Sequence, residues 1–197
     1  MMTLVWGLVA FLVVHSFRLI APNARHQLMT AMGPLPYKAA YSVASLLGFG
    51  LLVHGFSIAR QTEALLWVSP FWVKHLSLAL MWPAMVMLVS SFVPGSGIRA
   101  KLRHPMTLSV KTWAFAHLIA NGHLADVLLF GSMLVWSILI YRSAKEEDRS
   151  RMVGLMGSGA HLVNLGTLIS VVLGSLVWFW MAMGGGHRWL IGVSPLG

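Results

Sequence analysis

The stretch LVNLGTLISVVLGSLVWFWMAM, residues 162–183, contains no Asp, Glu, Lys or Arg. An apolar helix of about 20 residues is long enough to cross the hydrocarbon core of a bilayer, which is about 30 Å thick. Similar apolar runs occur near residues 3–21, 38–58, 72–93, 105–121 and 123–141. The sequence therefore predicts an all-α fold, a polytopic transmembrane bundle of about six helices.

The composition of the whole chain excludes an ordinary soluble domain. Of its 197 residues, 57% are hydrophobic and 10% are charged, whereas charged residues make up about 25% of soluble domains. Because the connections between the apolar runs are short, we expect one integral membrane domain over residues 1–197. The first run starts at Met1 without a basic leader or a cleavage site, so we expect it to be retained as a helix.

The net charge of +9 is distributed over alternate connections instead of one exposed face, which argues against a nucleic-acid partner. Ten of the 14 Lys and Arg residues follow the first, third and fifth runs: Arg18, Arg25, Lys38, Arg99, Lys101, Arg103, Arg142, Lys145, Arg149 and Arg151. Cytoplasmic loops carry an excess of such residues. The sequence therefore predicts that both termini lie on the outer, periplasmic side, with the lipid bilayer as a partner.

Small residues recur at four-residue spacing in two of the apolar runs, which predicts close contacts with neighbouring helices. They are Ala40, Ala44 and Gly48 in the second run, and Gly166, Ser170 and Gly174 in the sixth. No chemistry is needed to explain them.

The nine histidines are the strongest indication of chemistry in so apolar a chain, because neutral imidazole is a common metal ligand. The chain has no Cys, no pair of histidines four residues apart and no HExxH motif, so the usual ligand patterns of zinc are missing. Two imidazoles from different helices, with a macrocycle supplying the other ligands, need neither thiolate nor carboxylate. This pattern favours a b-type haem.

The stretch RHPMTLSVKTWAFAHLIANG, residues 103–122, presents two different surfaces if it is helical. At 100° per residue His117 shares a face with Trp113, whereas His104 and Lys111 project from nearly the opposite face. An aromatic wall beside His117 suits a flat porphyrin. The residue types therefore make His117 the first candidate for a metal ligand.

His15 is the second candidate, because Arg18 lies one turn further along the same predicted helix. The imidazole could ligate iron while the guanidinium pairs with a haem propionate. A single histidine in a transmembrane helix is more often a hydrogen-bonded packing residue, so other roles are left open. The residues without an assigned role are His54, His75, His161 and Lys111.

Four motifs follow one another along the chain: HSxR at 15–18, YxxxYS at 37–42, RHPM with KTWAFAHLIANG at 103–122, and IGVSPL at 191–196. Together they resemble the NnrU family of bacterial membrane proteins, whose relatives include the 15-cis-zeta-carotene isomerase. The resemblance implies a multi-pass protein of the bacterial inner membrane. It also implies a role linked to denitrification and nitric oxide metabolism, or to haem-dependent redox chemistry or isomerisation of an apolar small molecule.

From the isomerase relative, the resemblance implies a haem b held by two histidines that match His15 and His117. That relative has a cysteine beside its tryptophan where this chain has Ala114, so a step that uses a thiolate is not available here. Arg18, Arg103, His104 and Trp113 are the further candidate cofactor contacts. No catalytic residue is assigned.

Two other classes of function remain open at the level of sequence. RHP also occurs in membrane methyltransferases that modify isoprenylcysteine, where it precedes paired glutamates that contact S-adenosylmethionine. Here Arg103 could pair with the carboxylate of that cofactor, and Glu146 or Glu147 could bind its ribose. The chain lacks the aromatic segment that follows the glutamates in those enzymes. The third class is a non-catalytic scaffold or assembly factor, in which polar side chains only join helices.

Overall fold

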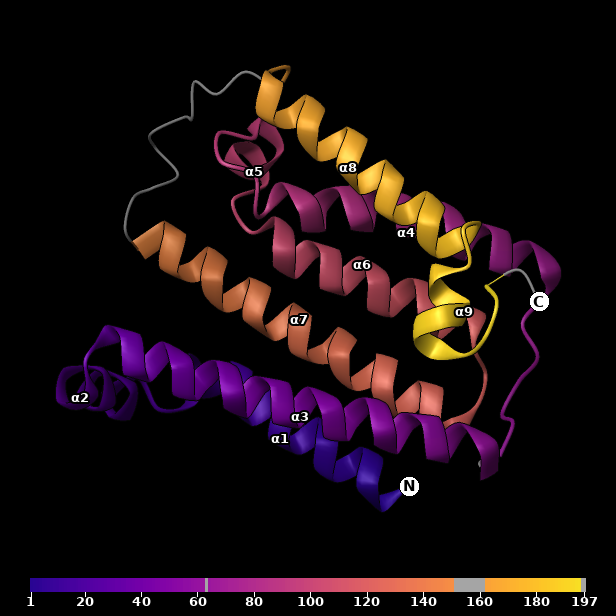
Figure 1. The fold of residues 1–197 in the computed structure, drawn as a ribbon, viewed down its shortest axis with the longest axis horizontal. Coiled ribbons are helices and arrows are strands. Elements are labelled where there is room, and N and C mark those ends of the chain that lie inside the picture. The colour runs from indigo at the N-terminus through magenta and orange to yellow at the C-terminus, as the bar shows by residue number, and fades with distance from the viewer. Residues whose placement is uncertain (63, 151–161, 196–197) are drawn as a thin grey trace. The chain divides into compact units, whose positions relative to one another are not determined.

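A computed structural model describes residues 1–62, 64–150 and 162–195 (Figure 1). The described residues form α-helices and no strand beyond an isolated bridge between Leu65 and His123. The helices are α1 (Met2–Ile20), α2 (Pro22–Met32), α3 (Pro34–Thr62), α4 (Phe71–Ser90), α5 (Gly97–Leu102), α6 (Pro105–Ala120), α7 (Leu124–Ser150), α8 (Leu165–Ala182) and α9 (Gly186–Ile191). The all-α polytopic fold predicted from the sequence is confirmed.

Five of these helices, α1, α3, α4, α7 and α8, are long and apolar enough to cross a membrane. The remaining predicted span, 105–121, is α6, which has 16 residues and is therefore only about 24 Å long. Many large apolar side chains of the described helices are exposed, as expected of a protein whose outer surface meets lipid. The chain is a multi-pass membrane protein.

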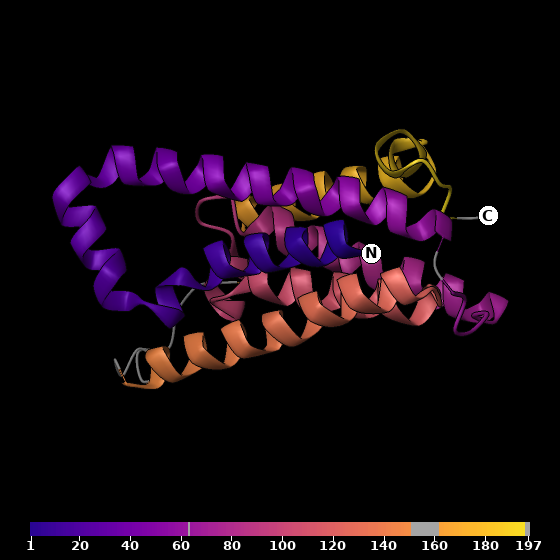
Figure 2. The same ribbon diagram turned by 90° about the horizontal axis from the view of Figure 1, so that it is seen from below.

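The chain folds as two compact units, and the first comprises residues 1–66 and 123–132. Figure 2 shows α2 joining α1 to α3, which run antiparallel and pack against each other. A Cβ atom at Gly7 would lie 2.5 Å from Leu52 Cα, and one at Gly55 would lie 2.5 Å from the backbone nitrogen of Leu4. The two backbones therefore approach so closely that only glycine fits at these positions.

The contact line on α3 differs from the predicted one. Gly48, Leu52, Gly55 and Ala59 are buried, whereas Ala40 and Ala44 are exposed. A helix has 3.6 residues per turn, so a line of contact alternates steps of four and three residues. A strict four-residue stripe rotates away from the partner helix.

A buried carboxylate joins the start of α7 to the end of α3 within this unit. Asp126, whose side chain is 1% exposed, lies 3.6 Å from Arg60 Nε and 3.3 Å from His123 Nδ1. It also accepts a hydrogen bond from the backbone N–H of His123 at 3.2 Å. The carboxylate therefore caps the first turn of α7 and faces a guanidinium, but its buried Oδ1 atom has no hydrogen-bond partner among the described residues.

The second unit comprises residues 67–122 and 133–197. Within it α4 packs against α6 on one side and α8 on the other (Figure 1). Buried serines join α4 to α6: Ser77 donates to the carbonyl of Ala116, and Ser109 donates to that of Ala84 at 2.7 Å. The predicted small-residue stripe of α8 lies at its contacts, since a Cβ at Gly174 would lie 2.6 Å from Val86 Cα.

Candidate functional site

His117 is held in one orientation by its own helix. Its Nδ1 atom donates a hydrogen bond to the carbonyl of Trp113 at 3.0 Å, and the two ring centres lie 5.2 Å apart. Because a carbonyl only accepts, Nδ1 carries a proton, and in the neutral ring the lone pair is then on Nε2. Histidines that bind metals are oriented in this way, with the second ring nitrogen donating to a backbone carbonyl.

His15 has the same arrangement on α1, in the first unit. Its Nδ1 atom donates to the carbonyl of Phe11 at 2.8 Å, and its ring stacks on that of Phe11 with centres 4.0 Å apart. The ring of Tyr41 meets it edge-on at 5.7 Å. Arg18 lies one turn further along, in the last turn of α1, and is exposed. The structure therefore keeps the predicted pair of His15 and Arg18 on one helix.

A third imidazole, absent from the sequence-based site, lies beside His117. The ring centres of His117 and His187 are 6.3 Å apart and their planes differ by 16°. His187 belongs to α9, and its Nδ1 donates to the carbonyl of Val193 at 2.7 Å. The two residues are 70 positions apart in the chain, and nothing in their local sequence predicts that they meet.

The hydrogen bond from Nδ1 to a backbone carbonyl is not shared by all histidines. His75 does share it, since its Nδ1 donates to the carbonyl of Phe71 at 3.2 Å. His54 contributes only its backbone carbonyl, to Ser57. His161 lies outside the described residues. Among the described residues no group of three or more His, Asp or Glu side chains could hold a metal ion, so a metal held there would need ligands from a macrocycle or solvent.

Arg103 and His104 lie at the opposite end of α6 from His117. Pro105 begins the helix and His104 precedes it as its N-cap, and the twelve residues from Pro105 to His117 rise about 18 Å. The structure therefore places Trp113 beside His117, but it places Arg103 and His104 in a separate cluster.

That cluster is built on a tight turn between α5 and α6. Arg103 has φ 62 and ψ −43, and the N–H of His104 donates to the carbonyl of Leu102 at 2.7 Å. A hydrogen bond across one residue at these angles is a γ-turn of the rare, strained kind. Such strain persists only where the surroundings impose it, and it is frequent at functional sites.

Asp148 is the partner that sequence inspection missed. One oxygen of its carboxylate, Oδ2, lies 3.4 Å from the Arg103 guanidinium and 3.0 Å from His104 Nε2. Asp148 lies in the charged last turns of α7, beyond the apolar part of that helix. The hydrogen bond with His104 and the positive charge of Arg103 therefore compensate the Asp148 carboxylate.

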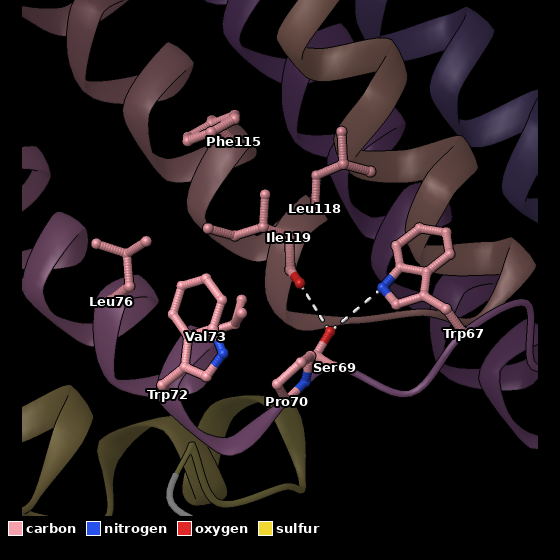
Figure 3. A pocket seen from close by; sticks show the side chains of 9 residues that line it. All are labelled: Trp67, Ser69, Pro70, Trp72, Val73, Leu76, Phe115, Leu118 and Ile119. Atoms are coloured by element: carbon pink, nitrogen blue, oxygen red, sulfur yellow. Dashed lines mark hydrogen bonds between the residues drawn. The ribbon is translucent and has the colours of Figure 1, made fainter.

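An apolar cavity of about 540 Å³ lies in the second unit, where the loop before α4 meets α6 (Figure 3). Ser69 bridges its two sides by donating to the carbonyl of Ile119 at 2.7 Å and accepting from Trp67 Nε1 at 3.2 Å. Its other lining residues are Pro70, Trp72, Val73, Leu76, Phe115 and Leu118. A wall of this kind has few polar groups with which to select one apolar molecule over another.

The fold and these sites define a multi-pass α-helical membrane protein with oriented histidines on its helices. The model of the family described as "NnrU protein" matches residues 3–195. The chain therefore belongs to the NnrU family. No curated protein and no solved structure matches it.

Proposed function

We propose that this protein binds haem b in the membrane, and that His117 and His15 are the residues that would hold its iron. The observation that carries the proposal is the hydrogen bond that each ring donates from Nδ1 to the carbonyl four residues back. This bond puts the lone pair on Nε2 and restrains the ring, which is the state an axial ligand needs. The imidazole donor set thus fits a haem, whose macrocycle supplies the remaining four ligands.

The side chains around each histidine support the same proposal. The indole of Trp113 beside His117 and the ring of Phe11 beside His15 offer apolar surfaces for a porphyrin. Arg18 is the candidate partner of a propionate, because it lies one turn from His15 at the end of α1. A haem with two histidine ligands supplies one-electron redox chemistry, so we propose electron transfer as the primary role.

We propose His187 as the alternative second ligand, because its ring lies beside that of His117. The centres of His117 and His187 are 6.3 Å apart. The resemblance to the isomerase relative favours His15 as the second ligand, whereas the short distance to His117 favours His187. Variants of both residues are therefore compared.

We also propose a role linked to denitrification and nitric oxide metabolism, because the resemblance to the NnrU family implies one. A haem held by two histidines would supply electron transfer in preference to gas binding. We also propose the bacterial inner membrane as the location, with both termini on the periplasmic side, because of the distribution of Lys and Arg.

The contact between Arg103 and Asp148 argues against the methyltransferase alternative. That alternative assigns Arg103 to the carboxylate of S-adenosylmethionine, but that guanidinium already faces Asp148 at 3.4 Å. Calorimetric titration with S-adenosylhomocysteine tests this alternative, and we expect no binding. A scaffold without cofactor becomes the favoured function if neither ligand binds.

The proposal is tested by counting haem per protein in purified histidine variants, as the pyridine haemochrome. We expect about one haem in the wild type and a loss of most of it in His117→Ala. Loss of haem in His15→Ala but not in His187→Ala supports His15 and His117 as the pair. The reverse result supports His117 and His187. The matched control is His75→Ala, because His75 also donates Nδ1 to a carbonyl. Equal haem in the wild type and His117→Ala would refute the proposal.

A further inference from the structure

We infer that the second unit carries a binding site for a phosphate group, formed by Lys111, Lys145 and the ring of Tyr141. The inference is independent of haem. It gives a role to Lys111, an ionisable residue in an apolar helix that the haem proposal does not use.

Two ammonium groups converge on one aromatic ring. Lys111 Nζ, from α6, lies 5.9 Å from the ring centre of Tyr141, and Lys145 Nζ, from α7, lies 5.7 Å from it. Each contact is favourable, because a cation is attracted to the face of an aromatic ring. The two cations nevertheless repel each other, so an anion between or beside them would stabilise the arrangement.

The carboxylates near this cluster are engaged elsewhere. Asp148 faces Arg103 and His104, and Glu146 lies 3.6 Å from Arg149. In the part of the chain that the structure describes, neither Lys111 nor Lys145 forms an ion pair with a carboxylate. Lys111, Lys145 and Arg103 together supply three positive charges in this region, and Asp148 supplies one negative charge.

The γ-turn at Arg103 contributes to this excess of positive charge. By holding Arg103 at φ 62, the γ-turn brings Arg103 and His104 onto the same oxygen of Asp148. Asp148 therefore pairs with the two residues of the turn and does not neutralise Lys111 or Lys145. His104 also meets the ring of Tyr141, edge-on at 6.3 Å, so the turn and the lysine pair share one neighbour.

The chemistry of the cluster selects phosphate. Lysine ammonium groups are compact charges that bind phosphate oxygens, and the tyrosine hydroxyl adds a hydrogen-bond donor. Basic pockets between membrane helices bind the headgroups of anionic lipids. The phosphate could belong to such a headgroup or to a soluble anion, and the experiment separates these two sources.

The test uses native mass spectrometry of the full chain in detergent, titrated with phosphatidylglycerol and, separately, with zwitterionic phosphatidylcholine. We expect tighter binding of phosphatidylglycerol, and a loss of roughly thirty-fold in its affinity for the Lys111→Gln/Lys145→Gln variant. The matched control is Lys38→Gln/Lys101→Gln, which removes the same charge from residues outside the cluster. Lys111→Arg/Lys145→Arg, which keeps the charge, should retain binding even if the glutamine variant folds poorly.

Inorganic phosphate, added at millimolar concentration, distinguishes the sources. Displacement of the lipid by phosphate supports a site for the phosphate group itself, whereas retention of the lipid supports a headgroup site that also needs the acyl chains. The inference is overturned if the lysine variant binds phosphatidylglycerol as tightly as the control variant does. It is also overturned if the wild type binds the two lipids equally.

Discussion

Charged side chains of this protein are positioned by partners that are distant in sequence. Asp148 meets Arg103 and His104 from 44 or more positions away, and Asp126 meets Arg60. Residue type predicted that histidines and arginines in an apolar chain need compensation, but it did not predict which carboxylate supplies it. Helical spacing correctly placed Trp113 beside His117, since residues four apart share a face. The neighbour His187 depends on the fold, so spacing could not predict it.

Asp126 gives a prediction at the scale of the residue. Asp126→Asn keeps the shape of the side chain but removes the charge that faces Arg60 and His123. We expect the variant to lose about 1.5–3 kcal/mol of stability, because hydrogen bonds to a charged group contribute that much. Thermal unfolding in detergent, followed by tryptophan fluorescence, measures the change.

Glu146→Gln is the control for this prediction. It breaks an ion pair with Arg149 in which both side chains are 76% exposed, and exposed pairs contribute less than about 1 kcal/mol. Equal melting temperatures for Asp126→Asn and the wild type would contradict a stabilising role for the buried carboxylate.

The long apolar helices were predictable from the sequence because each contains an uninterrupted apolar run. The short helices α2, α5 and α9 were not, since 11 residues in α2 and six each in α5 and α9 carry no such run. Proline marks the start of α2, α3 and α6, where its missing N–H is not needed. The boundary of α6 at Pro105 was therefore predicted closely, whereas the contact line on α3 required knowledge of its partner.

The contact between α1 and α3 gives a prediction at the scale of the element. Gly55→Ala places a methyl group 2.5 Å from the backbone nitrogen of Leu4, so one helix must move. We expect a loss of about 1–3 kcal/mol, the usual result of overpacking. The melting temperature of the purified variant measures it.

Gly50→Ala on the same helix is the matched control, because a Cβ there has nothing within 4 Å. Alanine is the better helix former, so this variant should be as stable as the wild type or more stable. If both variants melt at the same temperature, α1 and α3 do not pack as closely as described.

The topology in the membrane gives a prediction at the scale of the molecule. The chain has no Cys, so single cysteines can be introduced and labelled without background. Under the predicted orientation, Ala64→Cys between α3 and α4 faces outward and Ser150→Cys at the end of α7 faces the cytoplasm. A membrane-impermeant maleimide should label the first in intact cells and the second only after permeabilisation, and the opposite pattern would reverse the orientation.

We propose above that histidines on the helices of this NnrU protein hold a haem b. The most direct measurement is the absorption spectrum of the purified wild-type protein before and after reduction by dithionite. We expect a Soret band and, on reduction, separate α and β bands of a haem b held by two histidines. A fully folded preparation from haem-supplemented cells that shows no Soret band would contradict it.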